Sequence, residues 1–243
     1  AMFNSELKTK VGYNDYTIDA VNYLKQKDNS FFRINKDYSS GPAIHTSMND
    51  ARVQGYYGTQ CYFSFNQKNY IKFLGDLNVI DSKDENSTRW AKGLSDRPIL
   101  FSLASGKYWL SKRTDKAVVS MGFDSIAKFG DVTVYQNKFT LPLGFTYNKT
   151  IGEDEFKKLS PSQKDFCLLR ACVIGNEDNA DFKTLPKFNL GDTVSAMDFP
   201  NYSLYANELK KDNFNILKYI FIINNYFFFD FFFQGFVVHC IWA

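Results

Sequence analysis

The chain has 243 residues, and 44% of them are apolar or aromatic, which is enough to bury a sizeable core in one or two domains. Its formal charge is +3, from 29 basic and 26 acidic residues. This balance offers no argument for nucleic acid or for an anionic membrane surface as a partner, and we expect no nucleic-acid binding.

Caps and apolar periodicity predict alternating helices and strands in the first third of the chain. Asp15 or Thr17 caps one helix, whose residues Ile18, Val21 and Leu24 share a face. Asn66 caps a second helix, with Ile71, Leu74 and Leu77 facing inward. The elements predicted here are, in order, a helix at 15–25, a strand at 31–34, a polar loop at 38–50, a glycine-punctuated aromatic stretch at 54–65, a helix after residue 66 and an exposed loop at 81–92.

Helix-start signals are clearest further along the chain. Pro98 begins a predicted helix that Gly106 ends. Ser160 is a cap, and with Gln163 it predicts a capping box for a helix that ends at Gly175. The other predictions are strands at 107–110, near 118–119, at 126–129, at 132–135 and at 203–209, and a turn at 136–138 in which Tyr135 and Leu143 point inward and Asn137 holds the turn.

These elements predict a mixed α+β (α/β) chain, with a small mixed sheet, flanking helices and a β-rich C-terminal part. We divide it into an α/β domain at 12–150, a helix with the start of a β-rich subdomain at 151–210, and an apolar, Phe-rich tail at 211–243. Three interpretations of the tail stay open: a membrane span, very apolar strands, and a non-native end. Asp230 argues against a simple span, because a carboxylate at its centre costs about 2.5–3.5 kcal/mol.

The residue types favour neither a metal site nor a leader segment. The four cysteines form no CxxC pair and are joined by only two histidines, whereas structural zinc needs four such ligands at close spacing. Cys167 and Cys172 are predicted to be small buried residues on one helix. The first five residues, AMFNS, lack the basic and apolar regions of a signal peptide. Since Ala before Met is typical of a cloning remnant, we expect the chain to be a piece of a longer protein. From its residue types we expect no metal and no cofactor.

No catalytic signature stands out. The chain has no phosphate-binding glycine loop, no HExxH and no GxSxG. The acidic run at 153–155 could supply paired carboxylates for glycoside chemistry, but its place before the Ser160 helix favours a solvated surface. We therefore assign no catalytic residue.

Two groups of side chains are candidates for ligand binding. The loop at 49–58 places aromatic rings, which can stack on sugars, beside glycines and next to Asn and Asp, which can bond hydroxyls. Two separate cations, Arg33 on its predicted strand and Lys107 after Gly106, could pair with a phosphate. The structural alternatives, tyrosines that cover the core edge and cations that pair with carboxylates, stay open. The candidate ligand-binding residues are Arg33, Asn49, Asp50, Tyr56, Tyr57 and Lys107.

Short motifs in a fixed order carry a resemblance to a family. The most specific is VTVYQNKFTLPLGF at 132–145; the others are YLK at 23–25 before FFRI at 31–34, ND at 49–50 before GYYG at 55–58, YIKFL at 70–74, and GKY at 106–108. In this order they resemble the extracytoplasmic part of the YfhO family of bacterial multi-pass membrane proteins. The helix after Leu159 is similar to one in Bacteroidetes members. The resemblance covers about residues 15–209 and is expected to end after Leu209.

The resemblance implies a membrane-embedded glycosyltransferase of the C type, which uses a polyprenyl-phosphate-linked sugar to glycosylate cell-envelope polymers. Its catalytic acid would lie on an early loop between membrane helices, outside this chain, so no catalytic residue carries over. We expect a soluble extracytoplasmic domain, periplasmic or extracellular at the bacterial cell membrane, which is non-catalytic by itself and positions substrate or braces the parent. The expected partners are the parent's membrane helices and a polyprenyl-phosphate sugar or envelope glycan.

Two alternatives stay open. One is a carbohydrate-binding surface module that stacks sugars on Tyr56, Tyr57 and Trp109. The other is a purely structural domain, which the lack of a concave aromatic pocket would favour.

Overall fold

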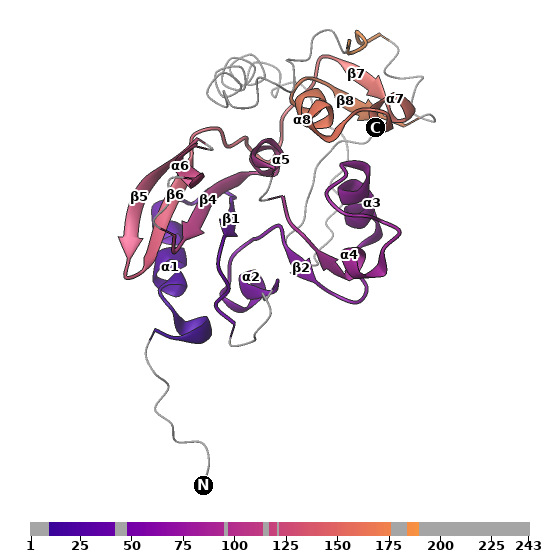
Figure 1. Ribbon diagram of the computed structural model, residues 1–243. Coiled ribbons are helices and arrows are strands. Elements are labelled where there is room, and N and C mark those ends of the chain that lie inside the picture. The colour runs from indigo at the N-terminus through magenta and orange to yellow at the C-terminus, as the bar shows by residue number, and fades with distance from the viewer. Residues whose placement is uncertain are drawn as a thin grey trace.

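The computed structural model describes residues 10–41, 48–94, 97–113, 117–120, 122–175 and 184–189. Its centre is a four-stranded sheet in the order β1-β4-β6-β5 (Figure 1). The first strand is parallel to its neighbour, whereas the other pairs are antiparallel. The mixed α+β class is confirmed. The strands of this sheet are β1 (Arg33–Lys36), β4 (Gly106–Ser111), β5 (Phe123–Phe129) and β6 (Val132–Asn137).

One face of the sheet is covered by α1 (Thr17–Lys27), the helix predicted at 15–25. Val21 and Leu24 pack there against Ile34 of β1 and against apolar residues of β4 and β6. Asp15 accepts a hydrogen bond from the Thr17 backbone N–H at 3.0 Å, which satisfies a donor in the first turn of the helix. Two residues of the predicted apolar face, Val21 and Leu24, are therefore buried against the sheet, whereas the third, Ile18, is only half-buried.

The opposite face of the sheet is aromatic. Trp109 of β4, Tyr135 of β6 and Phe123 of β5 meet Phe101 of α5 (Pro98–Leu103), and the Trp109 and Phe123 ring centroids lie 5.5 Å apart. Gly106 permits this approach, because a Cβ there would lie 2.4 Å from the Phe101 ring. The predicted helix at 98–104 and the strand at 107–110 are confirmed.

A second group of elements adjoins this aromatic face. It shares one apolar core with Trp109 and Phe101, and Leu74 and Phe156 belong to it. Lys164 holds the group together by donating to the Asp76 carbonyl and to the Asn78 side chain, both at 2.6 Å. The elements of the group are α3 (Lys68–Asp76), β7 (Thr150–Gly152), α7 (Glu153–Lys157), α8 (Pro161–Arg170) and β8 (Cys172–Ile174), with β7 parallel to β8.

Short elements complete the described part of the fold. A small sheet pairs β2 (Cys61–Tyr62) with β3 (Trp90–Ala91) in antiparallel fashion. The remaining short elements are η1 (Gly12–Asn14), α2 (Asp50–Val53), α4 (Glu85–Arg89) and α6 (Ala117–Ser120). Within the described residues, no helix combines the length and the apolarity needed to cross a membrane.

Three predictions about helix and strand boundaries are wrong. The capping box at Ser160 is present, but α8 ends at Arg170 because Ala171 is extended and the next residues pair with β7. Cys172 is therefore on a strand rather than on the helix of Cys167. The loop expected at 81–92 contains α4, whose first N–H groups bond the Asp84 carboxylate. The strand expected near 118–119 is instead the short helix α6.

The cap of α3 also differs from the prediction. Gln67, not Asn66, caps this helix and accepts a 2.6 Å hydrogen bond from the Tyr70 N–H. Asn66 donates to the Thr88 carbonyl at 2.7 Å and so ties the preceding turn to the chain before β3. A side chain that resembles a cap in the sequence is used here for a contact 22 residues away.

The turn after β6 is held as predicted. Asn137 donates to the Ser102 hydroxyl at 2.9 Å and to the Gly106 carbonyl at 2.8 Å, and it accepts from the Phe139 N–H. Tyr135 points inward, but Leu143 is only half-buried, and Leu141 takes the buried place against Ile99 and Phe166. The strands predicted at 203–209 and the Phe-rich tail lie outside the described residues.

Candidate functional site

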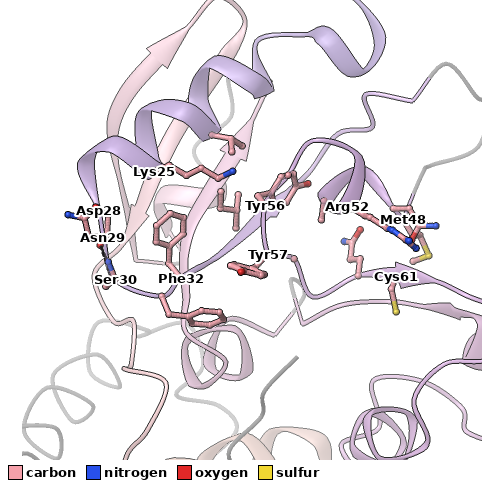
Figure 2. Close-up of a pocket in the computed structure, with 18 residues that line it drawn as sticks. Lys25, Asp28, Asn29, Ser30, Phe32, Met48, Arg52, Tyr56, Tyr57 and Cys61 are labelled. Atoms are coloured by element: carbon pink, nitrogen blue, oxygen red, sulfur yellow. Dashed lines mark hydrogen bonds between the residues drawn. The ribbon is translucent and has the colours of Figure 1, made fainter. Parts of the chain in front are cut away.

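A pocket of about 560 Å³ opens between the end of α1, the chain before β1 and the loop after α2 (Figure 2). This volume lies within the range of small-molecule sites. Four aromatic side chains line it, and these are Phe31, Phe32, Tyr56 and Tyr57. The lack of a concave aromatic pocket, which would have favoured a purely structural domain, is therefore not what the structure shows.

The loop after α2 brings its two tyrosines to the pocket. Gly55 has a positive φ of 71°, which lets the chain reverse directly after the helix. The Tyr56 N–H then bonds the Ala51 carbonyl at 2.9 Å, and the Tyr57 carbonyl accepts from the Ile34 N–H at 2.8 Å. The loop is thus fixed against both α2 and β1, so the pocket wall is built on paired backbone.

The two tyrosines have different surroundings. Tyr57 is 52% exposed, and its ring lies 5.2 Å from that of Phe31, centroid to centroid, with a tilt of 36°. Tyr56 packs deeper, and burial, followed by the charge of Asp50, raises the pKa of its hydroxyl well above the usual value. Tyr57 with Phe31 is therefore the accessible platform, while Tyr56 stays protonated and forms the floor.

Two cations line the same pocket. Lys25 comes from the last turns of α1 and Arg52 from α2, and both side chains are exposed. Lys25 Nζ lies near Gly55, 3.6 Å from the position that a Cβ would take there. In the described part of the chain neither side chain has a carboxylate within ion-pair distance. Their charge is available to an anionic group in the pocket.

The structure uses the predicted polar ligands of this loop for internal contacts. The Asn49 amide lines the pocket but exchanges two 3.1 Å hydrogen bonds with the Tyr62 backbone. Asp50 is 4% exposed, forms an ion pair with Lys36 and accepts from the Ser40 N–H at 2.8 Å. Contacts of these two side chains with sugar hydroxyls stay a prediction.

Arg33 and Lys107 are also engaged with protein atoms. Arg33 is 1% exposed and donates to the Ala104 carbonyl, and burial lowers the pKa of its guanidinium to about 10. Lys107 forms a 2.6 Å ion pair with Asp28. Burial opposes ionisation of Asp28, but hydrogen bonds from Lys107, Ser30 and Tyr108 outweigh it and lower the pKa of the carboxyl. A phosphate contact by Arg33 or Lys107 stays a prediction.

Trp109 is unavailable for sugar stacking. Its side chain is 6% exposed and packs edge-on against Phe101 and Phe123, and its indole N–H donates to Asp37 at 3.3 Å. The alternative of a carbohydrate-binding module therefore loses one of its three proposed platforms.

A buried polar cluster lies behind the pocket, on the α1 face of the sheet. Lys36 donates to Ser40 at 2.8 Å and to Gln54 at 2.9 Å, besides its ion pair with Asp50. Burial lowers the pKa of Lys36, and Asp50 opposes this shift. Asp15 extends the cluster by accepting from Ser40 and Gln54. These charges satisfy one another, so the cluster braces α1, β1 and α2 beneath the pocket.

The thiols and acidic groups form no metal centre in the described residues, where no three His, Cys, Asp or Glu side chains are close enough to hold an ion. Cys61, Cys167 and Cys172 are free thiols. Burial raises the pKa of Cys61 to about 11 and that of Cys167, together with the nearby Cys172, to about 12. These thiols are therefore poor nucleophiles at neutral pH.

Sequence patterns indicated the tyrosine loop of the site but not Phe31, Lys25 and Arg52. Lys25 follows Val21 by one helical turn, on the edge of the apolar face of α1, and this spacing was the available signal. Nothing in the sequence near Arg52 shows that its helix faces the end of α1. Only the packing of α1 and α2 around β1 brings the two cations to one pocket.

Comparisons with known proteins agree on one family. The family described as "Bacterial membrane protein YfhO" matches residues 3–225, which extends past Leu209, where we expected the resemblance to end. The "Uncharacterized protein YfhO" of Bacillus subtilis (strain 168) is 28% identical over 166 residues. That alignment covers 68% of this chain but 18% of the relative, so the chain spans about a fifth of the relative's length. No solved structure matches.

Proposed function

Since the chain belongs to the YfhO family of bacterial membrane proteins, we propose that the described residues form a domain on the outer side of the membrane that positions a sugar ligand for a membrane-embedded glycosyltransferase. The ligand is an envelope glycan or polyprenyl-linked sugar that carries a phosphate or carboxylate. The domain contributes binding, and the transfer chemistry belongs to another part of the parent protein.

The single observation that carries this proposal is the pocket that joins an exposed aromatic platform to two cations. Tyr57 and Phe31 offer ring faces on which the C–H face of a sugar can pack, which buries apolar surface on both partners. Lys25 and Arg52 add positive charge to the same pocket. An acidic or phosphorylated sugar needs both features, whereas a purely structural surface needs neither.

The rigid base of the pocket supports the same function. The ion pair of Lys36 with Asp50 joins β1 to the first residue of α2, and the Lys107–Asp28 pair fixes the chain between α1 and β1. A binding site built on fixed backbone loses little conformational entropy when its ligand binds. The pocket is therefore preorganised by the polar groups around it.

The test is a glycan array of bacterial envelope oligosaccharides, probed with the whole 243-residue chain and followed by calorimetry with the best ligand. We expect neutral sugars to bind more weakly than phosphorylated or carboxylated ones. Tyr57→Ala and Arg52→Gln should each reduce affinity at least tenfold, or about 1.4 kcal/mol. Phe65→Ser is the control, because Phe65 is exposed outside the pocket and its loss should leave glycan affinity unchanged.

Two results would contradict the proposal. One is the absence of binding to every envelope glycan on the array. The other is transfer or hydrolysis of a sugar by the chain alone, which would place the chemistry in this domain.

A further inference from the structure

Four aromatic side chains beside the pocket face solvent rather than the core. Tyr62, Phe63, Phe65 and Trp90, which we call the aromatic surface, are 36%, 46%, 86% and 43% exposed. Isolated exposed apolar residues are ordinary on proteins, and they need no explanation. These four exposed side chains all belong to one two-stranded sheet and the turn that follows β2, and clusters of exposed apolar side chains mark interaction sites.

The backbone holds the aromatic surface in place. Tyr62 of β2 lies directly opposite Trp90 of β3, and their ring centroids are 4.1 Å apart. The Phe63 N–H bonds the Arg89 carbonyl at 3.1 Å, and Asn66 bonds the Thr88 carbonyl. The turn that carries Phe65 is thus tied at both ends, so Phe65 projects from a fixed base rather than from a loose loop.

The chemistry of the aromatic surface matches a membrane–water interface. Trp and Tyr favour this layer, because their rings are apolar while the indole N–H and the hydroxyl can bond water or headgroups. Phe has no polar group and gains most when it reaches the acyl boundary. The stacked Tyr62–Trp90 pair and the strongly exposed Phe65 of the adjoining turn supply both properties.

Two lysines extend this match. Lys68 begins α3 directly after the aromatic turn, and Lys92 follows β3; both side chains are exposed. No carboxylate forms an ion pair with either lysine in the part of the chain that the structure describes. The nearby Glu85 is paired with Arg89, and Asp81 and Asp84, which line a second hollow together with Trp90 and Lys92, accept hydrogen bonds from backbone N–H groups. Lipid phosphates are complementary to such cations at the edge of an apolar patch.

We propose that the aromatic surface docks on the interface of a lipid bilayer, with Phe65 reaching furthest into it and Lys68 and Lys92 at the level of the phosphates. Membership of a family of membrane proteins makes a bilayer the nearest large apolar partner. The inference goes beyond the proposed sugar binding and does not require it, because none of the four aromatic residues lines the pocket.

Docking would also orient the pocket. Asn49 lines the pocket and holds both polar groups of the Tyr62 backbone, and Cys61 lines it from the same strand. The pocket and the aromatic surface are therefore adjacent parts of one rigid unit. Contact of Phe65 with the bilayer would bring the pocket close to the headgroups, where a membrane-anchored sugar is presented.

The experiment is flotation of the whole chain with vesicles of phosphatidylcholine, alone or with phosphatidylglycerol. We expect binding to both, and roughly tenfold weaker binding for Phe65→Ser, because one aromatic side chain is no longer removed from water. Lys68→Gln and Lys92→Gln should each lower binding only to the vesicles with phosphatidylglycerol, by about fivefold. Lipids brominated near the headgroups should quench the fluorescence of Trp90. The Trp90 signal is obtained as the difference in fluorescence between the unchanged chain and its Trp90→Phe variant.

Control variants distinguish bilayer docking from sugar binding, from misfolding and from self-association. Tyr57→Ala should bind vesicles as the unchanged chain does. Circular dichroism checks the folding of Phe65→Ser, which we expect to be unchanged because the Phe65 side chain is exposed. Unchanged flotation of Phe65→Ser overturns the proposal, because another segment would then hold the vesicle. A concentration-dependent dimer that Phe65→Ser abolishes, without any vesicle binding, also overturns it and assigns the surface to a second copy of the chain.

Discussion

The pocket and the buried polar cluster contain the same kinds of side chain, within a few residues of each other, and use them in opposite ways. Lys36 and Asp50 are buried and bind one another, whereas Lys25 and Arg52 lie at the pocket with no carboxylate partner among the described residues. A buried charge must be paired, because its desolvation costs free energy, whereas an exposed charge stays hydrated and needs no partner within the protein. Residue type therefore identifies a binding residue only together with its burial.

The largest expected effect comes from the buried cluster. Lys36→Met removes the cation from a buried ion pair and leaves Asp50 uncompensated, so the free energy of unfolding should fall by about 3–5 kcal/mol. Lys25→Met is the matched control and should change it by less than about 0.5 kcal/mol. Urea unfolding followed by circular dichroism measures both. Equal losses would show that the two lysines do not differ as the comparison requires.

A buried amide extends the comparison to neutral groups. Asn137→Ala removes hydrogen bonds to Ser102, Gly106 and Phe139, and the free energy of unfolding should fall by about 2 kcal/mol because buried partners are left unsatisfied. Asn148→Ala, at an exposed asparagine, should have almost no effect. Thermal unfolding of the two variants is a sufficient measurement. A stable Asn137→Ala protein would mean that water replaces the lost bonds.

Asp28 is half-buried, between the buried Lys36–Asp50 pair and the exposed cations of the pocket, and we expect it to make stability depend on pH. Its carboxyl pKa is lowered in the folded state, so its stabilisation is complete above the unfolded pKa of about 4 and is lost as the pH falls through the lower folded value. The unchanged chain should lose about 1 kcal/mol more stability between pH 6 and pH 3 than Asp28→Asn does. Urea unfolding at the two pH values measures this difference. Parallel losses in both proteins would show that the charge of Asp28 contributes nothing to stability.

The smallest effect on stability is expected at the pocket. Tyr57→Ala should lower the free energy of unfolding by less than about 0.5 kcal/mol, because half of the side chain is already in water, although the affinity for the proposed glycan ligand should fall at least tenfold. Tyr56→Ala is the contrast, since its ring is packed in the floor of the pocket and its loss should cost more stability. Calorimetry with the best glycan ligand and urea unfolding together separate the two roles.

Local signals predicted several elements correctly for identifiable reasons. Helix α1 follows from its apolar spacing, and α8 begins directly after its N-cap Ser160, because the capping box satisfies backbone groups within four residues. The end of α8 was missed, because Cys172 pairs with Thr150 and this contact is distant in sequence. Val118 and Val119 favour strands by propensity, yet they lie in a short helix. Contacts with distant segments, which local patterns do not contain, therefore decided where α8 ends.

The residues of the candidate site also divide into those that the sequence indicated and those that only the fold brought together. The sequence indicated the tyrosine loop, since rings beside glycines are visible as a pattern. It indicated Arg33 as a phosphate ligand on residue type alone, but the structure places this side chain in the interior, against the Ala104 carbonyl. Phe31, Lys25 and Arg52 gained significance only when the chain folded, because they come from separate segments and line one pocket only in the tertiary structure.

By itself, the sequence determined the family, the mixed α+β class and the elements with strong local signals, since caps, prolines and apolar periods act over a few residues. The tertiary structure decided which charged side chains are buried against a partner and which line the pocket, and it brought the rings of Tyr62 and Trp90 together. Burial and pairing depend on contacts between distant segments. No local pattern contains this information, and the pocket exists only where those segments meet.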